Sequence, residues 1–114
     1  MLPKGVYSWK ISDRFTAGIP DSYYSGNKGD LWVEYKFEQK VPATAKRHAR
    51  LSALQKTWLK ERHLEGRNVA VVIGFSDGKA GILHGSRTHD PINPQELVSH
   101  LDVVNFISGQ TCEA

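Results

Sequence analysis

The chain has 114 residues, of which 39% are hydrophobic and 24% charged, as expected for one globular domain over 1–114. No apolar run approaches the roughly 18 residues that a membrane-spanning helix needs, and the start, MLPKGVYSWK, lacks the apolar segment of a secretory signal. The lone Cys112 cannot form an internal disulfide. Together these features predict a cytoplasmic protein with no membrane partner.

The charge is unevenly distributed along the chain. The formal net charge is +3, and basic residues gather between Lys36 and Arg67, whereas Arg87 is the one lysine or arginine after Gly81. Such asymmetry is typical of a protein that presents one face to a polyanion. A solvated helix face explains the charge equally well.

The first part of the chain predicts three strands. The expected order is a strand over 6–11, a loop over 13–18, a strand over 21–24, a turn over 25–29 and a strand over 31–37. In the third strand Leu31, Val33, Tyr35 and Phe37 alternate with Trp32, Glu34 and Lys36, so each set takes one face. A polar, basic loop is expected over 38–50.

The second part predicts a helix, two strands and a final helix. Ser52 and Gln55 form a capping-box pattern at the start of a helix whose apolar stripe is Leu51, Leu54, Trp58 and Leu59, with Gly66 at its end. A strand buried on both faces follows over 68–75, and a further strand over 80–84. Asn93 is the expected N-cap of a last helix that buries Leu97, Leu101, Val104 and Ile107 and stops at Gly109.

This order, β-β-β-α-β-β-α, predicts an α/β fold with a mixed sheet flanked by helices. The helix between the third and fourth strands is long enough to join two parallel strands.

Three residues predict a metal-dependent phosphodiesterase site. Asp21 and Glu34 come from adjacent strands of a predicted hairpin, so their carboxylates can converge on one Mg²⁺, which prefers oxygen ligands. Lys36 is two residues beyond Glu34 and therefore on the same face, where an ammonium can orient an attacking water. The alternative is that Asp21 belongs to a turn and that Glu34 and Lys36 are ordinary strand residues.

The sequence also resembles a known family. Gly18-Ile-Pro-Asp21, Trp32-Val-Glu-Tyr-Lys36, Leu51 to Leu59 and the apolar strand Val69 to Ile73 resemble the VRR-NUC branch of the PD-(D/E)xK nucleases, and the match covers roughly Trp9 to Val104. The resemblance implies a restriction-endonuclease-like core, dependence on Mg²⁺ or Mn²⁺, and cleavage of DNA. Members that stand alone are often phage-encoded, form homodimers and cut branched DNA such as Holliday junctions.

Carried over by residue, the resemblance makes Asp21 and Glu34 metal ligands and Lys36 the catalytic lysine, in a bacterial or phage-infected cell. It also places Gln55 close to the active centre, whereas capping explains Gln55 without any catalytic role. The expected DNA contacts are Lys10, Lys40, Lys46, Arg47, Arg50, Lys56 and Lys60.

One departure from the family and three functions stay open. Related domains begin with a helix whose glutamate adds to the metal site, and Asp13 is the nearest acid here.

The leading function is a structure-specific DNA endonuclease. The alternatives are a sequence-specific homing or restriction-type endonuclease, and a non-catalytic DNA-binding subunit with an incomplete metal site.

Overall fold

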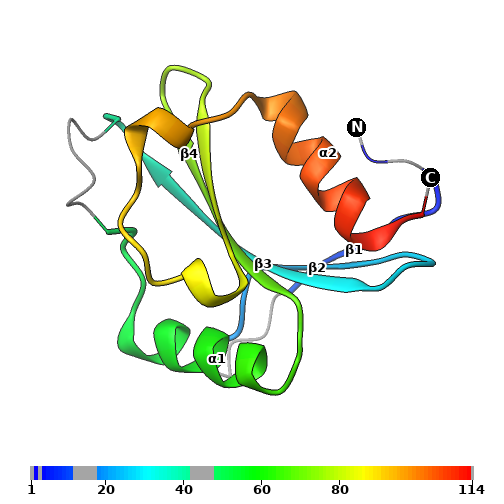
Figure 1. The fold of residues 1–114 in the computed structure, drawn as a ribbon. Coiled ribbons are helices and arrows are strands. Elements are labelled where there is room, and N and C mark those ends of the chain that lie inside the picture. Colours follow the sequence, from blue (N-terminus) through cyan, green and yellow to red (C-terminus); the bar gives the residue numbers. More distant parts are fainter. Residues whose placement is uncertain (1, 3, 12–17, 42–47, 114) are drawn as a thin grey trace.

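In the computed structural model, residues 2, 4–11, 18–41 and 48–113 are described. They form a five-stranded mixed sheet in which the strand order equals the chain order, with one α-helix on each face (Figure 1). The elements are β1 (Tyr7–Lys10), β2 (Ser22–Ser25), β3 (Asp30–Glu38), α1 (Ala53–Leu64), β4 (Val69–Phe75), β5 (Ala80–His84), two 3₁₀ turns (Gly85–Arg87 and Pro94–Glu96) and α2 (His100–Thr111). The predicted α/β class and element order are confirmed. No described helix is long and apolar enough to cross a membrane.

The sheet combines two antiparallel hairpins around one parallel pair. β1 pairs with β2 and β2 with β3 in antiparallel fashion, and β4 pairs with β5 in the same way. β3 and β4 are parallel, with Trp32 opposite Val69 and Glu38 opposite Phe75. A parallel pair needs a crossover connection, and α1 supplies it, as the sequence predicts.

The predicted cap of α1 is confirmed at both ends. The Ser52 hydroxyl accepts from the Gln55 backbone N–H at 3.1 Å, and the Gln55 side chain accepts from the Ser52 N–H at 2.9 Å. These bonds satisfy two of the N–H groups that a helix start leaves without partners. After the last turn, Gly66 adopts a φ of 86°, the left-handed conformation in which glycine ends helices at low cost.

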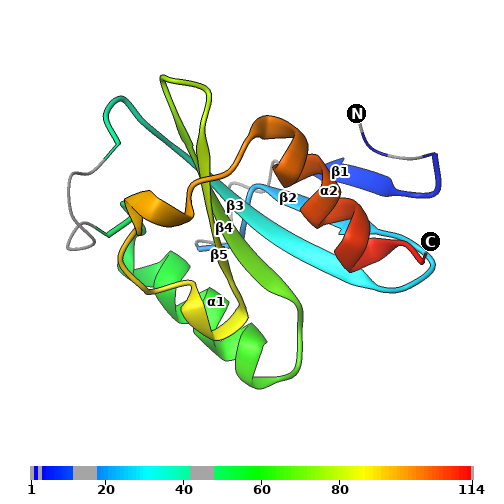
Figure 2. The same cartoon turned by 45° about the horizontal axis from the view of Figure 1, so that its top comes forward.

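Two apolar clusters fix the helices on the sheet, and Figure 2 shows α1 and α2 on its opposite faces. On one face Val103 and Ile107 of α2 belong to a cluster with Leu31 and Val33. On the other face Leu59 of α1 packs in a cluster with residues of β4 and β5, namely Val69, Val71, Ile73, Phe75 and Leu83. β4 contributes to both layers, which confirms the prediction that this strand is buried on both faces.

The last helix begins later than predicted. Asn93 caps the 3₁₀ turn Pro94–Glu96, and the α-helix starts after Ser99, which forms its own capping box with Asp102. The intervening Val98 pairs instead with Ala80 at the sheet edge. The α-helix therefore starts at the second capping residue, Ser99, and not at Asn93, because the pairing of Val98 with Ala80 keeps the chain extended between them.

Leu101, which is predicted to be buried, is exposed, and so are Phe37 and Leu54, which the sequence assigns to a strand face and to a helix stripe. Leu101 is 63% exposed because the late start of α2 turns Val103 and Ile107 toward the sheet in its place. Phe37 lies on the predicted face of β3 but is 67% exposed, and Leu54 in the first turn of α1 is 56% exposed. Gly109 lies within α2 and does not end it, since the helix continues to Thr111.

The β2–β3 turn closes on the end of α2 and predicts a test of the fold. The backbone N–H of Lys28 donates to the Thr111 carbonyl at 2.9 Å, and a Cβ at Gly26 would lie 2.3 Å from the same oxygen. Gly26→Ala should therefore destabilise the protein by about 1–3 kcal/mol, measured by urea unfolding. Gly29→Ala, whose Cβ would lie 3.9 Å from the nearest atom, is the control. Equal stability of the two variants would contradict this packing.

Candidate active site

The Asp21 carboxylate is held where strand pairing between β2 and β3 ends. Ser22 pairs with Val33, so Asp21 continues the register opposite Glu34. The Asp21 Oδ2 accepts a hydrogen bond from the backbone N–H of Tyr35 at 3.1 Å. The preceding Pro20 is fully buried and has no N–H to donate. The Pro-Asp pair thus ends the ladder and fixes a carboxylate at its end.

Gly18 brings this segment against the start of α1. It has a φ of 86°, and a Cβ there would lie 2.5 Å from the Leu54 carbonyl oxygen. A larger residue would be excluded both by backbone strain and by this contact. The close approach places the chain leading to Asp21 over the helix turn that carries Gln55.

Glu34 is the buried centre of the site. Its side chain is 3% exposed, and its Oε2 accepts from Gln55 Nε2 at 3.0 Å and lies 3.2 Å from Lys36 Nζ. Its Oε1 is buried and has no hydrogen-bond partner among the residues that the structure describes. A buried polar atom without a partner costs free energy. Glu34 is therefore positioned for a partner beyond these residues.

The surroundings of Glu34 oppose its ionisation. Burial raises the pKa of its carboxyl above the ordinary value, and the negative charge of Asp21 raises the pKa further. The Lys36 ammonium and, to a smaller extent, the backbone N–H of Asp21 favour the ionised form and lower the pKa. Two carboxylates that repel each other, together with one buried unpaired oxygen, are the electrostatic setting that a bound cation relieves.

Gln55 joins the helix cap to this carboxylate. Its Oε1 accepts from the Ser52 N–H, while its Nε2 donates to Glu34. The two roles that the sequence leaves as alternatives, capping and closeness to the active centre, are thus filled by one side chain at the same time. The amide is suited to both because it carries an acceptor and a donor.

A divalent cation fits part of this arrangement. Asp21 and Glu34 offer hard oxygen ligands of the kind that Mg²⁺ and Mn²⁺ prefer, and the unpartnered Glu34 Oε1 is a free ligand atom. Within the described ranges, no group of three or more histidine, cysteine, aspartate or glutamate side chains could hold a metal ion. Backbone oxygens or water would have to complete the coordination. The predicted substitute, Asp13, lies outside the described residues.

The predicted DNA contacts are divided between several surfaces. Lys40, Arg50, Lys56 and Lys60 are exposed, whereas Lys46 and Arg47 lie outside the described residues. Lys10 is opposite Ser22 in the sheet register and therefore projects to the face away from Asp21 and Glu34. It does not join the candidate site.

Glu38 is the last residue of β3, whereas the sequence predicts that it begins the loop over 38–50. Glu38 is 5% exposed and lies on the face of Glu34 and Lys36, with its Oε1 3.6 Å from Arg50 Nε. Continuing the two-residue period by one more step would have identified it. The pair fixes the end of the basic loop beside the candidate site.

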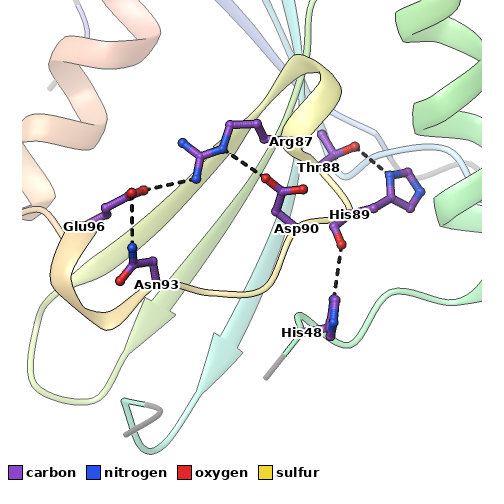
Figure 3. Close-up of polar contacts among 7 residues, drawn as sticks. All are labelled: His48, Arg87, Thr88, His89, Asp90, Asn93 and Glu96. Atoms are coloured by element: carbon purple, nitrogen blue, oxygen red, sulfur yellow. Dashed lines mark hydrogen bonds and ion pairs between the residues drawn. The ribbon is translucent and has the colours of Figure 1, made fainter. Parts of the chain in front are cut away.

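The cluster after β5, His-Gly-Ser-Arg-Thr-His-Asp, has a structural role (Figure 3). Arg87 pairs with Asp90 and Glu96 at 3.1 and 3.2 Å. His89 Nε2 donates to the Lys56 carbonyl at 3.0 Å, and the His89 carbonyl accepts from His48 at 3.2 Å. These bonds fasten the loop to α1 and to the chain before it, as expected of a surface loop rather than an acid-base site.

Comparison with known proteins shows a likeness in fold. No family model matches the sequence, and no curated protein matches it. Among solved structures, the chain is similar to Hjc from Archaeoglobus fulgidus, a Holliday junction resolvase from an archaeal hyperthermophile, with a TM-score of 0.53 and 15% sequence identity. The match covers 90% of this chain and 88% of the resolvase.

At 15% identity this likeness concerns the fold. The mixed five-stranded sheet with a helix on each face is an α/β, restriction-endonuclease-like core, as predicted from the sequence. The specific resemblance to the VRR-NUC branch stays a prediction.

Proposed function

We propose that this protein is a metal-dependent DNA endonuclease that acts on branched or otherwise structured DNA. The observation that carries the proposal is the buried Glu34 carboxylate, which contacts Lys36 and Gln55 and faces the charge of Asp21. Its fold is shared, over most of both chains, with a protein described as a Holliday junction resolvase. A carboxyl whose pKa is raised by burial and by a neighbouring charge is a common property of catalytic sites.

In this proposal Asp21 and Glu34 would hold Mg²⁺ or Mn²⁺. Such an ion, when bound, stabilises charge on the phosphate and lowers the pKa of a coordinated water. The two carboxylates alone would repel a phosphate, and a bound cation would offset that repulsion. Asp21 is kept in place by the Tyr35 N–H, and Gln55 keeps Glu34 from turning away.

Lys36 acts on the water and on the phosphate. Its ammonium lies 3.2 Å from Glu34 and is 24% exposed, so it can reach a substrate without leaving its partner. In hydrolysis the water oxygen bonds to phosphorus and the bond to the leaving sugar oxygen breaks. The water gives up a proton to solvent, and the leaving oxygen takes up a proton from solvent. Lys36 orients that water and balances charge on the phosphate. The basic residues Lys40, Arg50, Lys56 and Lys60 would contact neighbouring phosphates, and two copies acting together would suit a two-fold junction.

The direct test uses junction, flap and blunt duplex DNA with Mg²⁺ or Mn²⁺. We expect cleavage of branched substrates, and a loss of about 100-fold or more in Asp21→Asn, Glu34→Ala and Lys36→Ala. Glu61→Gln, which removes an exposed carboxylate on α1, is the control. Sequence-dependent cutting of plain duplex would favour a restriction-type enzyme. Binding without any cleavage would favour a non-catalytic subunit.

The two roles of Gln55 can be separated by a matched pair of variants. Ser52→Ala and Gln55→Ala each break the capping box, so each should lower stability by about 1 kcal/mol. Gln55→Ala alone removes the donor to Glu34, and it should also lower cleavage by roughly 10- to 100-fold. Thermal melts and cleavage rates measured together check this. A similar loss of activity in both variants would reduce Gln55 to a capping residue.

The raised pKa of Glu34 predicts a pH-dependent cost in stability. Below the pKa of this carboxyl in the unfolded chain, both states bind the proton, and ionisation costs nothing. As the pH rises through the higher folded pKa, the folded state must lose a proton that it binds more tightly, so stability falls. Glu34→Gln removes this cost. In EDTA, the melting temperature of Glu34→Gln should rise relative to that of the natural protein as the pH goes from mildly acidic to neutral. A difference in melting temperature that does not change with pH would contradict a raised pKa of Glu34.

A further inference from the structure

Three aromatic side chains form a row across the first three strands. Trp9 is paired with Tyr23, and Tyr23 is paired with Trp32. Directly paired residues project to the same side of a sheet, so these three residues, here called the aromatic row, share one face. The Tyr23 and Trp32 ring centroids are 4.5 Å apart, and Trp58 of α1 meets Trp32 edge-on at 5.3 Å.

The aromatic row lies beside the two carboxylates. Tyr23 follows Asp21 by two residues, and Trp32 precedes Glu34 by two residues. Because alternate residues share a face, all four side chains are on the same side of the sheet. Neighbouring side chains on that side of one strand are two residues apart, which is roughly 6.6 Å. This spacing is about the length of one nucleotide in an extended strand.

Packing explains part of the aromatic row but not Trp9. Trp32 and Trp58 are partly buried against the core cluster beneath α1. Trp9 is on the edge strand β1 and is 49% exposed, and Tyr7, on the same face, is 63% exposed. A large exposed aromatic side chain contributes little to folding, and its contact area remains available to a partner.

We propose that the aromatic row stacks an unpaired base of the DNA substrate next to the phosphate that is cut. The proposal rests on the proposed nuclease function and narrows its substrate class to DNA in which a strand leaves the duplex, as at a flap, a splayed arm or an open junction. Bases inside a duplex have both faces covered, whereas an unpaired base can stack on an aromatic side chain in any sequence.

The charged groups beside Trp58 are paired with one another, and within the aromatic row the Tyr23 hydroxyl donates to the Asp30 carboxylate. The Arg62 guanidinium lies 5.6 Å from the Trp58 ring centroid and is paired with Glu61 and Glu65 at 3.1 Å each. Attraction of phosphate to this part of the surface is therefore weak. Stacking should persist at salt concentrations that weaken the contacts of the basic segment, because ionic screening acts on charges and not on ring contacts.

The test measures binding of DNA without cleavage, in EDTA and raised salt. Of the three tryptophans of the chain, Trp9 and Trp32 belong to the aromatic row, and Trp58 contacts Trp32. Oligothymidylate should therefore quench the intrinsic fluorescence, and blunt duplex should not. Trp9→Ala should raise the Kd for labelled oligothymidylate about 10-fold in anisotropy titrations, and Trp9→Phe should restore most of the affinity. Phe37→Ala, which removes an aromatic side chain that is more exposed than Trp9 and lies on the opposite face, is the control.

Two results of the binding measurements would overturn the proposal. One is an unchanged Kd in Trp9→Ala with a native melting curve. The other is a change confined to self-association in sedimentation experiments without DNA, which would make the aromatic row a contact between copies of the chain. Failure to cleave DNA, with binding that still depends on Trp9, would refute the nuclease function alone. Cleavage with the same flap-to-duplex preference in Trp9→Ala would refute the stacking alone.

Discussion

The candidate site depends on keeping an ionisable carboxyl, Glu34, in a place where its charge is disfavoured. The carboxylate is almost fully buried, and the charge of Asp21 adds to the effect of burial in raising its pKa. One of its oxygens contacts Lys36 and accepts a hydrogen bond from Gln55. The other oxygen has no hydrogen-bond partner in the described part of the chain. An isolated buried charge would be expensive. A cation bound to the second oxygen would offset this cost.

The sheet and α1 together hold the residues around Glu34 in place. The hairpin of β2 and β3 sets Asp21 opposite Glu34, and the capped start of α1 presents Gln55 to the same carboxylate. Gly18 allows the chain before Asp21 to approach α1 closely. The parallel pairing of β3 with β4 then anchors the strand of Glu34 in the middle of the sheet. Each side chain of the site is therefore fixed by backbone pairing or by a helix cap, which is how precise geometry is maintained.

Local chemistry made much of this predictable from the sequence. The alternation around Glu34, the Ser52–Gln55 capping box and the apolar strand Val69–Phe75 are short-range signals, and all three are present as expected. Errors arose where two local signals competed. Asn93-Pro94 and Ser99 each start a helical turn, and the pairing of Val98 with Ala80 decided between them. That pairing is a tertiary contact, which no local pattern reveals.

The aromatic row shows the same limit, since it depends on register. Trp9, Tyr23 and Trp32 are far apart in sequence, and hairpin pairing places them side by side. The unusual contact between the Asp21 carboxylate and the Tyr35 N–H likewise follows from where the strand ladder ends at Pro20. Sequence patterns identify which residues are able to act. The strand register decides which of them meet.

The most direct measurement of the central claim is the proton release that accompanies cation binding. Titrating Mn²⁺ into the protein by calorimetry in buffers of different ionisation enthalpy reports how many protons leave the site. Because the pKa of Glu34 is raised, we predict binding that releases protons at mildly acidic pH, releases fewer as the pH rises, and is lost in Glu34→Gln. Equal Mn²⁺ affinity in Glu34→Gln, or binding without proton release at any pH, would contradict a metal site built on this carboxylate.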